Sequence, residues 1–229
     1  MEKQEYIEKN EKLFDRWKKT AFVTDGIIDL DEWFKLDNDK HILVVLKEAY
    51  IRDGNFYDWD LTKWIQGEQC CENRECGKSD CSDCKITGST YNRVAEWIYG
   101  ITTGKYDTWL GLKNEEQTIS KYCEERKKQL KKVAIINVKK RNGTKVSSKS
   151  ELKCIAKIER DNLKQQIDMI SPSIIICGGT IECLKIVYGK DYSDSEKNVL
   201  IIDSPHPNAR VEAQEMFNNI LQQMINRRN

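Results

Sequence analysis

The chain has 229 residues, of which 39% are hydrophobic and 33% are charged, and this suits a single domain with room for an insertion. The formal net charge of +1 excludes the global basic field that marks many nucleic-acid-binding proteins, and no apolar run is long enough to cross a membrane. Because the charged N-terminus also has no signal peptide, we expect a cytoplasmic protein without a membrane partner.

Apolar runs rich in β-branched residues predict buried strands, and helical periodicity appears between them. Strands that are apolar throughout and alternate with helices predict a parallel sheet covered on both faces. We therefore expect an α/β fold, a three-layer α/β/α sandwich with a central four-stranded parallel sheet, as one domain over residues 1–229. A polar segment at 139–150 predicts a mobile loop. The expected elements, in chain order, are helix 3–18, strand 42–46, helix 91–98, helix 119–130, strand 133–137, helix 152–170, strand 173–177, helix 179–187, strand 199–202 and helix 211–225.

Polar residues follow the predicted strands at the points where they end. Glu48 follows the first strand, Asn137 ends the second, Gly178-Gly179 follows the third, and His206 follows the fourth. The carboxyl ends of parallel strands meet at one edge, where open α/β sheets bind their ligands. His206 lies between two prolines, which stiffen its loop, and histidine is the side chain that titrates nearest neutrality. The sequence therefore predicts a site at this edge, with a solvated turn as the alternative for the histidine.

The order of these motifs resembles that of the uracil-DNA glycosylase superfamily. Residues 43–50 resemble the family's water-activating loop, although Lys47 stands where the family usually has glycine. Residues 133–137 resemble the strand whose terminal asparagine reads the edge of a flipped base. His206-Pro207-Asn208 resembles the family's His-Pro-Ser loop, with an asparagine in place of the serine. The resemblance covers most of the chain but not its cysteine-rich part.

The resemblance implies a role for each strand-end residue. Glu48 would orient a water and stabilise an oxocarbenium-like sugar, while His206 would donate a hydrogen bond to the departing base. Asn137 would read a Watson–Crick face, because an amide donates and accepts at once. Each residue also has a structural alternative, as a solvated strand end, a turn or a turn cap. The aromatic candidates for the base pocket, for which core packing is the alternative, are Tyr50, Tyr57 and Trp59.

A second set of residues is expected to contact the DNA backbone. Backbone N–H groups at the start of a helix can hold a phosphate, and the glycine pair after the third strand precedes such a helix. A tight turn between strand and helix is the alternative for these glycines. The expected DNA-binding residues are Lys47, Gly178, Gly179, Ser204, Pro205, Asn208 and Arg210.

A cysteine-rich insertion at 66–90 interrupts the domain. Thiolates this close together suit a tetrahedral zinc site whose role is structural rather than catalytic. The alternative is a polar loop with reduced, unliganded thiols. Cys70 could replace the first ligand of the expected set, which is Cys71, Cys76, Cys81 and Cys84.

These expectations combine into one function. The chain is expected to be a monomeric, monofunctional DNA glycosylase that needs no cofactor for catalysis. It would flip uracil or, more in keeping with its departures from the family, a modified pyrimidine such as a hypermodified phage cytosine, and hydrolyse the bond to deoxyribose. Release of such a base would leave an abasic site and could serve antiviral defence. The alternative is a non-enzymatic nucleic-acid-binding or partner-binding module with a zinc-pinned insertion.

Overall fold

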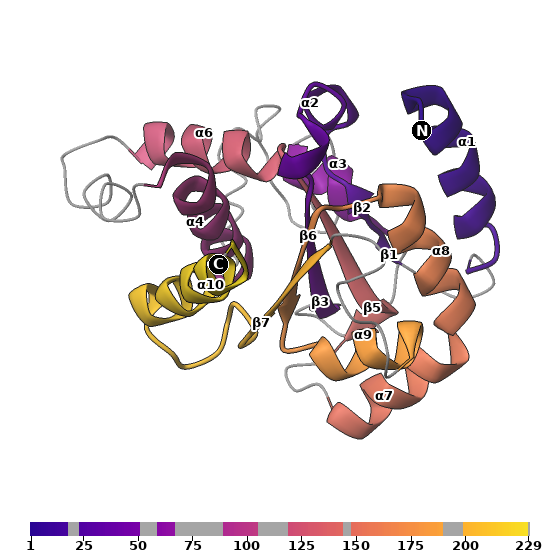
Figure 1. The fold of residues 1–229 in the computed structure, drawn as a ribbon. Coiled ribbons are helices and arrows are strands. Elements are labelled where there is room, and N and C mark those ends of the chain that lie inside the picture. The colour runs from indigo at the N-terminus through magenta and orange to yellow at the C-terminus, as the bar shows by residue number, and fades with distance from the viewer. Residues whose placement is uncertain are drawn as a thin grey trace, which may run out of the picture.

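Figure 1 shows the computed structural model of the chain, which describes residues 1–17, 23–50, 59–66, 89–104, 119–143, 148–189 and 199–228. The helices are α1 (Lys3–Phe14), α2 (Leu30–Trp33), η1 (Asn38–Lys40), α3 (Leu61–Gln66), α4 (Ser89–Thr103), α6 (Ile119–Leu130), α7 (Lys149–Ile158), α8 (Arg160–Ile170), α9 (Ile181–Tyr188) and α10 (Ala213–Arg228). The strands are β1 (Val23–Thr24), β2 (Gly26–Ile27), β3 (Ile42–Tyr50), β4 (Trp59–Asp60), β5 (Val133–Gly143), β6 (Ile174–Gly178) and β7 (Leu200–Ser204). In the described residues no helix is both long and apolar enough to cross a membrane.

The main sheet has five strands in the order β2-β5-β3-β6-β7. Strand β3 runs parallel to both β5 and β6, and β6 runs parallel to β7. All four predicted strands are therefore present and parallel. The prediction of a wholly parallel four-stranded sheet is wrong at one edge, where β2 pairs antiparallel with β5. Strand β2 has only two residues, too few to give a periodic pattern in the sequence.

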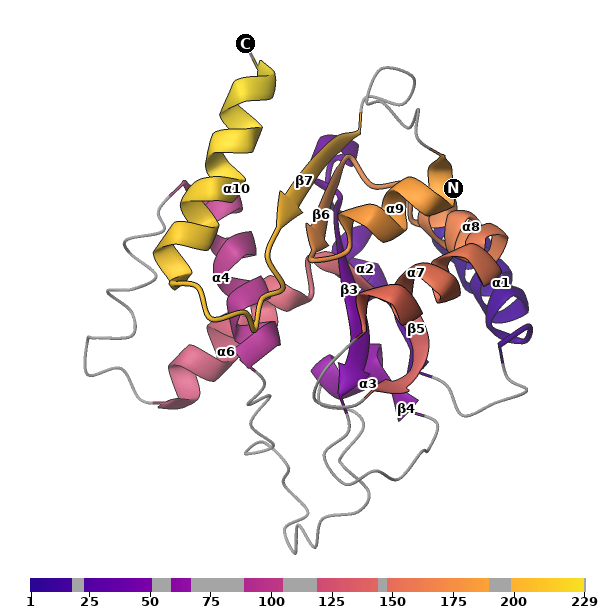
Figure 2. The same cartoon turned by 90° about the horizontal axis from the view of Figure 1, so that it is seen from below.

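Helices cover both faces of this sheet, as Figure 2 shows: α1, α7, α8 and α9 on one side, and α4, α6 and α10 on the other. Alternate residues of a strand point to opposite faces, so each strand contributes to two apolar clusters. Leu43 and Val45 of β3 are buried in one cluster, and Val44 and Leu46 are buried in the other. This double burial explains why the sequence of β3 is apolar throughout rather than alternating.

Two segments have a different secondary structure from the one predicted for them. The helix expected at 152–170 is divided at Glu159 into α7 and α8, and the carboxylate of Glu159 accepts from the indole N–H of Trp17 at 2.7 Å. The loop expected at 139–150 is wrong at both ends, because β5 continues to Gly143 and α7 begins at Lys149. Its lysines are tolerated in a strand since Lys139 and Lys140 both meet carboxylates, as described below.

Candidate functional site

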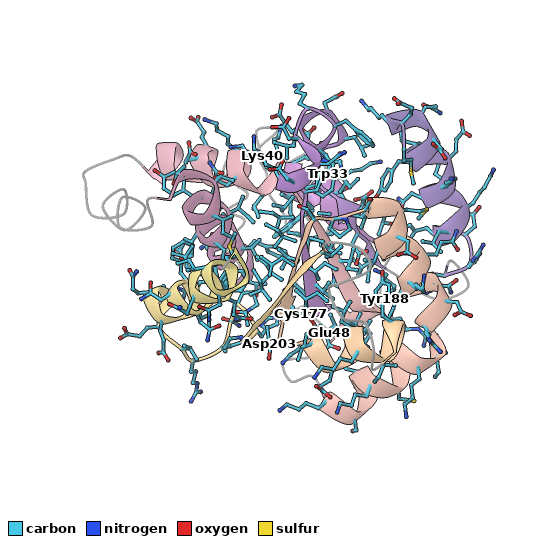
Figure 3. All side chains as sticks on the ribbon, in the orientation of Figure 1. Trp33, Lys40, Glu48, Cys177, Tyr188 and Asp203 are labelled. Atoms are coloured by element: carbon cyan, nitrogen blue, oxygen red, sulfur yellow. The ribbon has the colours of Figure 1, made fainter. Side chains whose placement is uncertain are left out.

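The carboxyl ends of the parallel strands meet at one edge of the sheet, as predicted. Figure 3 labels Glu48, Cys177 and Asp203 at this edge, near the ends of β3, β6 and β7. The polar residues there do not form one cluster. Adjacent residues of β3 point to opposite faces, so Lys47 and Glu48 take part in two separate groups.

The first group is built around His206, which is half-buried in the loop after β7. The backbone N–H of Asn208 donates to His206 Nδ1 at 3.2 Å, and the N–H of Ala209 donates to the carbonyl of His206 at 2.7 Å. Because Nδ1 accepts a hydrogen bond, the proton of the neutral ring belongs on Nε2. Burial, and secondly the charge of Lys47, lower the pKa of His206 to about 4. At neutral pH this histidine is therefore an uncharged ring that presents an N–H donor.

The glycine pair lets the end of β6 approach both Lys47 and the His206 loop. Gly179 has a φ of +70°, and a Cβ there would lie 3.1 Å from Lys47 Cε and 3.4 Å from the His206 backbone nitrogen. A Cβ on Gly178 would lie 3.0 Å from Pro207 Cδ. The N–H of Gly179 donates to the carbonyl of Ser204 at 2.7 Å, so it is not available to hold a phosphate. The pair thus brings Lys47 and His206 together by its lack of side chains.

The second group is built around Glu48, whose side chain is 5% exposed. Its Oε2 lies 3.4 Å from Lys139 Nζ, and the same ammonium lies 2.7 Å from Glu151 Oε1. Burial alone would lower the pKa of Lys139, but the hydrogen bond that it donates to Glu151 and the charges of both carboxylates raise its pKa overall. The carboxylate of Glu48 also packs directly on the backbone of Gly143, where a Cβ would lie 2.3 Å from Glu48 Cδ. Glu48 is therefore held rigidly beside a charged ammonium, not beside His206.

Asn137 belongs to a third, fully buried group whose centre is Asp25. Both the backbone N–H and the side-chain Nδ2 of Asn137 donate to Asp25 Oδ2, at 2.8 and 3.2 Å. Lys140 Nζ lies 2.6 Å from Asp25 Oδ1, and Gln166 Nε2 donates to the same oxygen at 3.0 Å. Burial lowers the pKa of Lys140, although Asp25 opposes the shift. Asn137 Oδ1 is buried without a hydrogen-bond partner among the described residues, so the acceptor of this amide is left over.

Sequence reasoning missed Asp25, Lys139, Gly143 and Gln166 as partners of the candidate residues. Asp25 stands alone between two strands of two residues each, which carry no recognisable pattern. The lysines at the end of β5 read as a solvated basic run in the sequence. The register of β3 against β5 sets Glu48 opposite Lys139, and Lys140 meets Asp25 from the segment between β1 and β2.

Some of the other predicted site residues lie in the described part of the chain, and others lie outside it. Ser204 is buried with its hydroxyl unbonded in the described part of the chain, while Pro205, Asn208 and Arg210 are exposed. Tyr50 ends β3 and Trp59 begins β4, and only their backbones are described. Among the described residues no group of three or more His, Cys, Asp or Glu side chains could hold a metal ion. The positions that lie outside the described residues are Tyr57, Cys71, Cys76, Cys81 and Cys84.

The chain was compared with protein-family models, with curated proteins and with solved structures, and it matches none of them. Its function must therefore be argued from the geometry of these three groups.

Proposed function

We propose that the protein is a monofunctional DNA glycosylase with a fold like that of the uracil-DNA glycosylase superfamily. The observation that carries the proposal is the His206 loop: a neutral imidazole, fixed in one tautomer, at the carboxyl edge of an α/β sheet. A rigid N–H donor of this kind stabilises negative charge that develops on a leaving group, since it needs no reorganisation during the reaction.

The chemistry of base removal assigns a task to the His206 group and to the Glu48 group. As the N-glycosidic bond breaks, the base gains negative charge on a carbonyl oxygen, and His206 Nε2–H donates to that oxygen. The sugar gains positive charge, which a carboxylate stabilises while it orients the attacking water, and Glu48 is the candidate. Its ion pair with Lys139 keeps the carboxylate in a fixed position. The substrate is uracil or a modified pyrimidine such as a hypermodified cytosine, and Lys47, beside the histidine, contacts a phosphate or a polar group of the base.

A second candidate function is a binding module without catalysis. It is favoured by the bonds that Glu48 and Asn137 already make: the first is held by Lys139 and the second by Asp25. In this alternative the sheet edge is a scaffold that supports the neighbouring segments. It differs from the glycosylase in what it predicts for variants, because loss of His206 would leave binding intact.

Base release from a panel of DNAs distinguishes the two functions. The panel holds uracil, hypoxanthine, 5-hydroxymethylcytosine and glucosylated hydroxymethylcytosine, and alkaline strand cleavage reports abasic sites. We expect wild type to release one of these bases, and His206→Ala and Glu48→Gln each to slow the release about 100-fold or more. Glu182→Gln, a change of an exposed carboxylate on α9, is the matched control and should keep full activity. Folded wild-type protein that releases no base from any DNA would favour the binding module.

A further inference from the structure

A hollow lies on the side of the sheet covered by α1 and α7, next to the end of β5. Its volume is about 450 Å³, within the range of small-molecule pockets. The end of α1, the last residues of β5 and one side of α7 form its walls. The residues that line it are Arg16, Trp17, Lys139, Lys140, Arg141, Glu151, Cys154, Ile155, Ile158 and Glu159.

The cations of this hollow fall into two classes. Lys139 and Lys140 are neutralised by carboxylates, as described above. Arg16 donates to two neutral amide oxygens, those of Asn162 at 3.3 Å and Gln165 at 2.9 Å. Arg141 is exposed, and among the described residues no carboxylate forms an ion pair with it or with Arg16. Within the described part of the chain, two guanidinium groups at one hollow thus have no ion pair with a carboxylate.

The two carboxylates that line the hollow make their described contacts with other groups and not with the guanidinium groups. Glu151 accepts from Lys139, and Glu159 accepts from the indole of Trp17 and from Asn162 at 3.0 Å. A planar guanidinium is suited to bidentate contact with phosphate, and it holds its charge at any physiological pH. A bound anion would therefore make the ion pairs that the described residues do not make with these two guanidinium groups.

The remaining wall is apolar. Ile155 is partly buried, and Ile158 is 73% exposed, the highest value among the large exposed apolar side chains of the described residues. A bare phosphate would leave this wall in water, whereas a purely apolar ligand would give the two guanidinium groups no anionic partner. The lining fits a ligand that joins an anion to a flat or apolar body.

We propose that this hollow binds a nucleoside monophosphate unit, with its phosphate on Arg16 and Arg141 and its base against Ile155 and Ile158. The unit comes either from a free nucleotide or from a single strand of nucleic acid, and both carry the same chemistry. The proposal does not depend on base excision, because none of these four residues takes part in the proposed reaction.

Cys154 provides a direct test, because it lines the hollow and is exposed, while Cys177 and Cys183 are buried. The rate of its alkylation, resolved by mass spectrometry of the peptide that contains it, reports occupancy. We expect deoxycytidine monophosphate or a short single-stranded oligonucleotide to slow the alkylation saturably. Deoxycytidine and inorganic phosphate, each given alone, should protect more weakly. Protection by the monophosphate identifies a free-nucleotide site, and protection by the oligonucleotide alone identifies a strand site.

The variant Arg16→Gln/Arg141→Gln should weaken that protection at least about tenfold, since it removes the charge-assisted hydrogen bonds to the phosphate. Lys35→Gln/Lys40→Gln removes the same charge from the opposite end of the sheet, where Figure 3 labels Lys40, and should change nothing. Circular dichroism checks that both variants are folded. Equal protection in the two double variants, or no protection of wild type by either ligand, would overturn the proposal, whatever the outcome of the base-release assay.

Discussion

The same sheet edge carries polar residues on both sides of β3, and the two sides use them differently. On the β6–β7 side, backbone hydrogen bonds and a glycine pair hold Lys47 and His206, and the imidazole keeps a donor to spare. On the β5–β2 side, Asp25 accepts from Asn137, Lys140 and Gln166 in a fully buried network. A donor on a half-buried ring can reach a ligand, whereas the Asp25 network is fully buried and its ionic groups bond one another, which suits stability even though Asn137 Oδ1 has no partner among the described residues. The comparison therefore assigns function to the His206 group and structural support to the Asp25 network.

The largest expected effect tests the structural side. Asp25→Ala leaves the ammonium of Lys140 buried and removes the acceptor of Asn137, so we expect the free energy of unfolding to fall by about 3–5 kcal/mol. Urea denaturation measures it. Asp31→Ala is the matched control, since Asp31 is exposed and its solvent-screened ion pair with Lys3 contributes little to stability.

A further variant sharpens the same test. Asp25→Leu combined with Lys140→Met removes both charges at once, and we expect it to be markedly more stable than Asp25→Ala, because no uncompensated charge stays buried. If Asp25→Ala and Asp31→Ala proved equally stable, the buried network would not be the structural support assigned here.

An intermediate effect is expected on the β6–β7 side. Gly179 and Gly104 both have a positive φ, +70° and +66°, but a Cβ on Gly104 would meet no atom of the described residues within 4 Å. Gly104→Ala should therefore cost only the backbone strain, about 1–2 kcal/mol. Gly179→Ala adds contacts with Lys47 and the His206 backbone, so it should cost more and should also displace the loop.

Base release separates these two glycine variants more sharply than stability does. We expect Gly104→Ala to retain the wild-type rate and Gly179→Ala to lose most of it, when both are measured at a temperature where each is folded. Equal rates would mean that the position of His206 does not depend on the glycine pair. The glycine pair would then not preorganise the His206 loop.

The sequence predicted the parallel strands and the edge at which they end, because long apolar runs and turn residues are local signals. It also predicted that Lys47, Gly179 and His206 would lie at that edge, where the structure brings them together. It did not predict that Glu48 turns away from His206, because that depends on strand alternation and on the register of β3 against β5. Asp25 was missed for a related reason: its partners are 112 to 141 residues away in the chain, and no local pattern marks it.

The smallest expected effect concerns the titration of the two histidines, which makes the stability of the fold depend on pH. The chain has only two histidines, so NMR resolves each, and His206→Gln assigns the signals. We expect His206 to titrate near 4, chiefly because of burial, and His41 below its ordinary value, because it is buried and stacked on Trp33. Both shifts favour the neutral ring in the folded state.

The direction of the pH effect on stability follows from these shifts. Above the ordinary histidine pKa of about 6.5, the folded and unfolded states are both neutral, and these groups contribute no pH dependence. As the pH falls below that value, the unfolded chain takes up protons first, so the histidines' contribution to the free energy of unfolding declines toward pH 4. His206→Gln should make this decline shallower without abolishing it, because His41 still contributes. Lys47→Met should raise the pKa of His206 only in part, since burial is the larger cause. A His206 that titrates near 6.5 in wild type would instead be a solvated turn residue, charged for part of the time at neutral pH and unsuited to donate from a fixed neutral ring.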